Sequence, residues 1–184
     1  MRLAKKKPQM SNLEIRYVES FAKNFDQIIE FGSGLSTLKW AAKFVNVISI
    51  ETRAEWFNKI KVLTAAKHKN VKMIFSPPES SAYSDDGEEQ WNIRVPSDYG
   101  LGHEFSGYLE TAKRVIGNQT IPCVIFIDAN MRTEILEIAI NSKICHEILV
   151  HDVIPERDYL NLWRKNYAEN IVTQIDSLVH VKQI

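Results

Sequence analysis

Five short runs of apolar residues, rich in β-branched and aromatic side chains, recur along the 184-residue chain. They lie at residues 27–31, 45–50, 71–75, 123–127 and 147–150. The runs are continuous rather than alternating, which is typical of strands buried on both faces, as in a parallel sheet. Segments with apolar residues at helical spacing separate them, as Leu35, Leu38 and Ala42 illustrate. This alternation predicts an α/β fold with a doubly wound, Rossmann-like sheet.

Segments near both ends of the chain extend this pattern. Residues 12–23 form an amphipathic stretch before the first run, and two β-rich runs at 170–175 and 178–183 are separated by Asp176 and Ser177. Two such runs around a short turn predict an antiparallel hairpin that closes the sheet. The length of the chain favours one domain, and we expect residues 1–184 to form it.

The interval 76–106 is irregular. It combines prolines and the acidic residues of 85–89 with the aromatic side chains of Tyr83, Trp91 and Tyr99. A stretch of this length without clear periodicity is typical of a functional lid or of an insertion. Because it follows the carboxyl end of the third expected strand, where open α/β sheets bind ligands, we expect a lid.

The charge balance limits the classes of partner. The chain has 23 Lys and Arg against 23 Asp and Glu, so its formal net charge is zero and nothing attracts it globally to nucleic acid. The compact basic run at 5–7 is typical of a solvated tail, and we do not expect a nucleic-acid partner. The chain has two cysteines, no secretory signal and no apolar window that could span a bilayer. We therefore expect a cytoplasmic protein without a membrane partner.

The first run continues into a loop that contains two glycines. Gly32 and Gly34 allow a sharp turn before the next helix, which is typical of a loop that holds a nucleotide-containing cofactor. The dinucleotide fingerprint requires a third glycine where this chain has Thr37, so the NAD pattern is broken. Instead Glu30 lies two residues before Gly32, and a carboxylate there suits a cationic ligand such as an amino group or a sulfonium.

A second carboxylate, Glu51, follows the second run. It lies near the spacing, about 20 residues after the loop, at which an acidic residue binds the ribose hydroxyls of a cofactor. Alone, Glu51 would be interpreted as an ordinary strand-end acid, but together with the loop it favours a cofactor site. Arg53 leaves an NADP-type cofactor open, because its side chain can face a 2′-phosphate.

These segments resemble class I S-adenosylmethionine-dependent methyltransferases over nearly the whole chain. Residues 28–41 (IIEFGSGLSTLKWA) are similar to the branch with an E-F-G-x-G-x-S-T motif, and 126–132 (FIDANMR) and 148–153 (ILVHDV) resemble its fourth-strand and fifth-strand motifs. One departure is that Ala129 and Asn130 replace the usual glycine of the fourth-strand motif. The resemblance implies a seven-stranded sheet, mostly parallel with a C-terminal antiparallel hairpin.

The resemblance also implies the residues of a cofactor site. The methionine part of S-adenosylmethionine would be held by the glycine loop and the helix after it, and the ribose by Glu51. The loop and helix residues in question are Glu30, Gly32, Ser33, Gly34, Ser36 and Thr37.

Asp128 and Asp152 follow neighbouring expected strands, at the edge where the cofactor would bind. Two such carboxylates can hold Mg²⁺ with several waters and so acidify an acceptor hydroxyl, and Asn130 can add a neutral ligand. His151 is a candidate general base. It can instead be a buried strand histidine, because successive strand residues point to opposite faces and His151 and Asp152 then do not both face the site. Arg132 can pair with Asp128 or bind an anionic substrate. The candidate catalytic residues are thus Asp128, His151 and Asp152, and the candidate metal ligands are Asp128 and Asp152.

The sequence predicts a methyltransferase that uses S-adenosylmethionine, with Mg²⁺ as a candidate second cofactor. The expected acceptor is a hydroxyl group of a small molecule or of a carbohydrate. Two alternatives stay open. A cofactor-binding interaction module without catalysis would account for the altered loop after Asp128, and an NAD(P)-dependent oxidoreductase would account for the glycines and Arg53. No motif specifies an oligomeric state.

Overall fold

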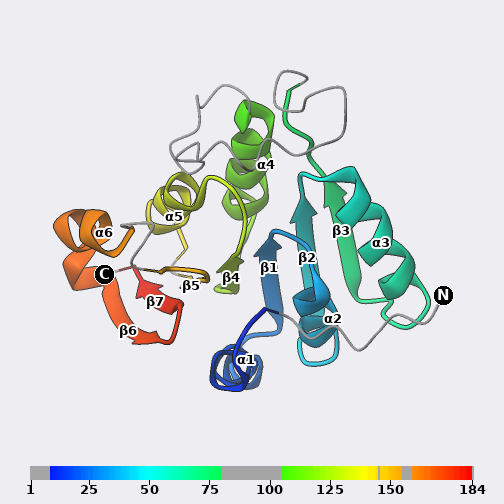
Figure 1. The fold of residues 1–184 in the computed structure, drawn as a ribbon, viewed down its shortest axis with the longest axis horizontal. Helices are drawn as coiled ribbons and strands as arrows, with labels where there is room; N and C mark the ends of the chain where they lie inside the picture. Colours follow the sequence, from blue (N-terminus) through cyan, green and yellow to red (C-terminus); the bar gives the residue numbers. More distant parts are fainter. Residues whose placement is uncertain (1–8, 80–104, 145, 155–158, 184) are drawn as a thin grey trace.

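The computed structural model describes residues 9–79, 105–144, 146–154 and 159–183. In these residues seven strands form one sheet with the order β3-β2-β1-β4-β5-β7-β6 (Figure 1). The strands are β1 (Gln27–Phe31), β2 (Asn46–Glu51), β3 (Val71–Phe75), β4 (Val124–Ile127), β5 (Glu147–Val150), β6 (Ile171–Ile175) and β7 (Leu178–Lys182). Strands β1 to β5 are parallel, whereas β7 is antiparallel to both β5 and β6. This confirms the predicted α/β sheet and its closing antiparallel hairpin.

The expected strand bounds agree with the structure to within one residue at each end. The agreement follows from burial, because β4 and β5 are buried along their whole length and can therefore be apolar on both faces. The hairpin turn is Asp176 and Ser177, and Asp176 takes the left-handed φ of 50° that such tight turns favour in Asn and Asp.

Helices cover both faces of the sheet (Figure 1). The described helices are α1 (Asn12–Ser20), α2 (Leu35–Ala41), α3 (Ala54–Ala65), α4 (Ser106–Gly117), α5 (Arg132–Ile140) and α6 (Tyr159–Tyr167), with short 3-10 turns at Phe21–Lys23 and Ala168–Asn170. Helices α1 and α2 pack on one face, and α4, α5 and Trp163 of α6 pack on the other. In the described part of the chain, no helix combines the length and the apolar character needed to cross a membrane.

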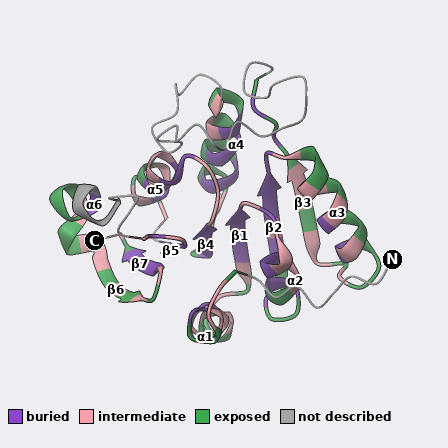
Figure 2. Ribbon diagram, in the orientation of Figure 1, coloured by how far each residue is buried: buried purple, intermediate pink, exposed green. Residues whose placement is uncertain are grey.

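Alternate residues of the central strands supply two separate cores. Ile29, Phe31 and Ile125 pack toward α4 and α5, whereas Ile28 and Phe126 pack toward α1 and α2. Figure 2 shows the consequence, with β1, β2 and β4 largely buried and the outer sides of α3 and α4 exposed.

The register of the parallel strands brings the candidate residues to one edge. Phe31 at the end of β1 pairs with Ile50 of β2 and with Ile127 of β4, and Ile127 pairs with Val150 of β5. The residues that come next, at the carboxyl edge of the sheet, are Gly32, Glu51, Asp128 and His151. Residues 80–104, most of the expected lid, lie outside the described residues, and the lid stays a prediction.

Candidate functional site

Gly32 turns the chain at the carboxyl end of β1 with a φ of 93°, which side chains rarely tolerate. A Cβ atom at this position would lie 2.1 Å from the backbone oxygen of Asp128. The close approach is fixed by two hydrogen bonds, because Gly32 N donates to Ile50 O at 2.9 Å and Asp128 N donates to Phe31 O at 2.8 Å. The glycine thus lets the loop after β1 pass directly against the chain that leaves β4.

The Glu30 carboxylate is fully buried beneath the glycine loop. Ser36 Oγ and Ser49 Oγ each donate a hydrogen bond to it at 2.6 Å, and the Thr37 hydroxyl donates a third. Burial raises the pKa of Glu30 to about 7, although the three hydroxyls partly offset the rise. With no exposed surface, Glu30 ties the first turn of α2 to strands β1 and β2.

Ser49 is a residue of this site that the sequence analysis missed. Its hydroxyl also lies 2.7 Å from that of Ser33, so it joins the glycine loop to the middle of β2. The available signal was a serine inside an otherwise apolar strand. Gly34 completes the loop, and its N–H donates to Thr37 Oγ1 at 3.1 Å.

Glu51 closes the other side of the glycine loop. Its Oε1 accepts hydrogen bonds from the backbone N–H groups of Thr52 and Arg53, both at 2.8 Å, and the backbone N–H of Ser33 also bonds to the carboxylate. Burial raises the pKa of Glu51, and these backbone donors lower it in part. Glu51 is therefore held rigidly beside the loop at the end of β2.

Asp128 is more open than Glu51, with a side chain 31% exposed, whereas Glu51 is buried. Its Oδ1 lies 3.2 Å from His151 Nδ1 and 3.1 Å from Arg132 Nη2. Burial by itself raises the pKa of Asp128, but His151 and Arg132 together bring it below its ordinary value. Asp128 is thus an ionised, partly exposed group at the carboxyl edge of the sheet.

His151 lies between two carboxylates rather than facing open space. Its Nδ1 faces Asp128, and its Nε2 lies 3.7 Å from Oε2 of Glu14, while the ring is almost completely buried. Burial lowers the pKa of His151, but Asp128, Glu14 and Asp152 outweigh that effect and raise it. Both ring nitrogens face carboxylates of the chain, so this geometry suits a group that positions Asp128 better than it suits a general base.

Glu14 lies in the first turn of α1, and its carboxylate also reaches residues far from this helix. Its Oε2 accepts a hydrogen bond from Ser11 N at 2.7 Å in a capping box, and its Oε1 accepts bonds from N and Oγ of Ser177, at 2.9 and 2.8 Å. The same buried carboxylate therefore joins α1, the β6–β7 turn and His151. The Ser-x-x-Glu pattern of residues 11–14 is typical of such a cap, but local spacing does not indicate these distant partners.

Asp152 turns back toward Asp128 although it follows His151 directly. Its backbone is left-handed, with a φ of 63°, so the alternation of an extended strand does not continue through it. As a result, Nη2 of Arg132 lies between the two carboxylates, 3.1 Å from Asp128 Oδ1 and 3.6 Å from Asp152 Oδ2.

This arrangement does not fit the expected magnesium site. The two carboxylates converge on a guanidinium, and the described residues contain no group of three or more His, Cys, Asp or Glu side chains that could hold a metal ion.

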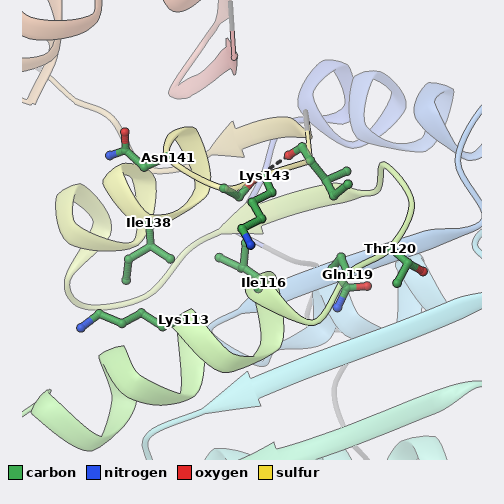
Figure 3. Close-up of a pocket in the computed structure, with 10 residues that line it drawn as sticks. Lys113, Ile116, Gln119, Thr120, Ile138, Asn141 and Lys143 are labelled. Carbon is green, nitrogen blue, oxygen red and sulfur yellow. Dashed lines mark hydrogen bonds between the residues drawn. The ribbon is translucent and has the colours of Figure 1, made fainter.

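A cavity of about 600 Å³ lies elsewhere on the molecule, between the carboxyl ends of α4 and α5 (Figure 3). Ile116 and Ile138 line it, together with Lys113 and Lys143. The loops that carry it lead into β4 and β5, so it lies at the opposite edge of the sheet from Asp128. The two lysines suit the partial negative charge of the helix ends.

No protein-family model and no curated protein matches the sequence. Among solved structures, the chain is similar to a methyltransferase-like protein from Silicibacter pomeroyi, with a TM-score of 0.67 and 17% identity over 96% of this chain and 88% of that one. It is also similar to a putative caffeoyl-CoA O-methyltransferase from Staphylococcus aureus, with a TM-score of 0.59 and 15% identity over 95% and 84% of the two chains.

A third similar structure is a putative methyltransferase from Streptococcus mutans in complex with SAH, with a TM-score of 0.51 and 14% identity over 95% of this chain and all of that one. Structures of an rRNA methylase and of a tRNA methyltransferase match as well. At these identities the likeness concerns the fold. The chain therefore shares its seven-stranded α/β fold with these solved methyltransferase structures.

Proposed function

We propose that the protein is an S-adenosylmethionine-dependent methyltransferase. The observation that carries the proposal is the loop between β1 and α2, which is built on a buried glutamate, three hydroxyls and a glycine at a φ of 93°. This loop lies beside Glu51, at the carboxyl edge where open α/β sheets bind ligands. A neighbour of the same fold was solved in complex with SAH, which supports the choice of cofactor.

Each group has a distinct task in this proposal. Gly32, Ser33 and Gly34 form the surface on which the methionine part rests, and Glu30 holds that surface from below without touching the ligand. Ser36 and Thr37 act with Glu30, because their hydroxyls bond to it. Glu51, held by three backbone N–H groups, accepts hydrogen bonds from the ribose hydroxyls.

The acceptor that we propose is a hydroxyl group of a small molecule or of a carbohydrate. When bound, the cofactor supplies the methyl group. Asp128 accepts a hydrogen bond from the acceptor hydroxyl and so aims the oxygen for in-line attack, which is largely a gain from proximity and orientation. Asp128 would hold the hydroxyl proton in this hydrogen bond during methyl transfer, and water would take the proton up, because the lowered pKa of Asp128 makes it a weak base. His151 and Arg132 hold Asp128 in place.

The cofactor assignment is tested by calorimetric titration with SAH. We expect saturable binding to the wild type, weakened between about tenfold and a hundredfold in Glu51→Gln, because a charged hydrogen-bond acceptor is lost from the ribose. Glu55→Gln is the matched control, since Glu55 is exposed in the first turn of α3 and should not alter binding. Absence of SAH binding to the folded wild type would overturn the proposal.

A double-mutant cycle makes the test specific to the ribose. The 2′-deoxy analogue of SAH should bind the wild type more weakly than SAH does, yet bind Glu51→Gln almost as well as SAH does. The two losses share one interaction, so they should not add. If they add fully, Glu51 does not hold the ribose.

A separate assay of methyl transfer to a panel of hydroxyl compounds and to RNA would identify the acceptor. Both are included because a putative O-methyltransferase and an rRNA methylase share this fold.

A further inference from the structure

The two strand-end carboxylates, Asp128 and Asp152, already share a cation that belongs to the chain. One nitrogen of Arg132, Nη2, lies 3.1 Å from Asp128 Oδ1 and 3.6 Å from Asp152 Oδ2. A divalent ion that bridged these two oxygens would lie between them, at about 2.0–2.1 Å from each in the case of Mg²⁺. The guanidinium therefore stands where the ion would be.

Arg132 is fixed in this position by contacts other than the two carboxylates. Its Nε donates a hydrogen bond to the backbone oxygen of His151 at 3.0 Å, and its side chain is only 7% exposed. Arg132 is also the first residue of α5 and follows Met131, whose backbone is left-handed with a φ of 60°. These contacts hold the guanidinium between the two carboxylates from three sides.

Charge points the same way as geometry. Arginine keeps its positive charge at every pH that proteins experience, so Nη2 would repel a divalent ion at contact distance. His151, whose Nδ1 is 3.2 Å from Asp128, also faces this carboxylate and adds a second positive charge when protonated. The two carboxylates are thus already balanced by side chains from the chain itself.

We infer that Arg132 is the built-in cation of this site: it replaces the divalent metal ion that the Asp128 and Asp152 pair would otherwise bind, and it positions both carboxylates toward the acceptor. The inference rests on the proposed function for its catalytic meaning. Two consequences follow: the wild type binds no divalent ion at this pair, and methyl transfer does not require one.

The decisive experiment is a titration with Mn²⁺, followed by calorimetry and by the electron paramagnetic resonance signal of the free ion. We expect no Mn²⁺ site at the carboxylate pair in the wild type, and at least about tenfold tighter binding in Arg132→Gln, where the neighbouring positive charge is gone. This new site should disappear in Arg132→Gln combined with Asp152→Asn. Arg132→Lys keeps the charge and should behave as the wild type does.

The opposite result is equally clear. A Mn²⁺ site in the wild type that Asp128→Asn or Asp152→Asn abolishes would overturn the inference, and so would Arg132→Gln binding Mn²⁺ no better than the wild type. If Arg132→Gln does not fold, the wild type and the two asparagine variants still decide the matter. Calorimetry with SAH in the presence of EDTA, on the same samples, tests the proposed function separately: loss of SAH binding there speaks against the cofactor and leaves the metal titration intact.

Discussion

The substitution Glu30→Gln should make the protein more stable at neutral and alkaline pH, although it removes three hydrogen bonds to a charged group. Glu30 is fully buried, and burial raises its pKa to about 7, against an ordinary value of 4.5. Between these two values the unfolded chain has lost the Glu30 proton while the folded chain still holds it. The free energy of unfolding of the wild type therefore falls as the pH rises through this range.

The size of the effect follows from the two pKa values. Because one pKa unit corresponds to about 1.4 kcal/mol, Glu30 should cost the folded state about 3 kcal/mol at pH 8 relative to pH 4. Glutamine keeps the shape of the protonated acid, and the hydroxyls of Ser36, Thr37 and Ser49 can donate to its oxygen or accept from its nitrogen. The variant should therefore lie within about 1 kcal/mol of the wild type near pH 5 and exceed it by about 3 kcal/mol at pH 8.

Urea unfolding of both proteins at intervals from pH 5 to pH 8 measures this difference. Taking the difference between the two proteins at each pH removes the contributions of other titrating groups, His151 among them. Glu55→Gln changes the same charge at an exposed position and should show no such trend. A difference between wild type and Glu30→Gln that does not grow with pH would refute the reasoning.

Two further predictions concern the loop and the buried histidine. Gly32→Ala should lower the free energy of unfolding by about 3–5 kcal/mol, because its Cβ would lie 2.1 Å from Asp128 O at a φ of 93°. Gly107→Ala in α4, which has open space around it, is the control and should be neutral or raise the free energy of unfolding by up to about 1 kcal/mol in the same urea assay. Comparable values for the two variants would contradict the steric argument. The pKa of His151, measured by NMR titration, should lie above 6.5 and should fall in Glu14→Gln, because the Glu14 carboxylate helps to raise it. His151 should therefore add stability below pH 6.5, and this stability should be lost as the pH rises through the folded pKa. A pKa that is unchanged in Glu14→Gln would contradict the contact with Glu14.

The strands were predictable because burial on both faces leaves a continuous apolar run that little else in a soluble chain produces. The glycine loop and Glu51 were likewise predictable as neighbours, since the carboxyl ends of adjacent parallel strands meet at one edge. The burial of Glu30 was not, because it depends on Ser49, whose side chain is aligned with it only by the register of β1 and β2.

The polar cluster at β4 and β5 was the least predictable part. Alternation along a strand predicts that His151 and Asp152 point to opposite faces. The backbone of Asp152 is left-handed, so the alternation does not apply to it. The sequence left open whether Arg132 pairs with Asp128 or binds an anionic substrate. The structure shows the ion pair with Asp128 and a second ion pair with Asp152, which no local spacing indicated. Contacts of this kind depend on tertiary packing rather than on periodicity.

The Glu14 carboxylate has a consequence for how the molecule responds to distant changes. It bonds the first turn of α1 and the Ser177 turn between β6 and β7, and it faces the histidine that contacts Asp128. The hairpin at the edge of the sheet and the carboxyl end of β5 are therefore parts of one electrostatic unit. Loosening the hairpin turn would admit water to the buried histidine and change the charge beside Asp128, so a substitution at Ser177 would be felt at the carboxyl edge of the sheet.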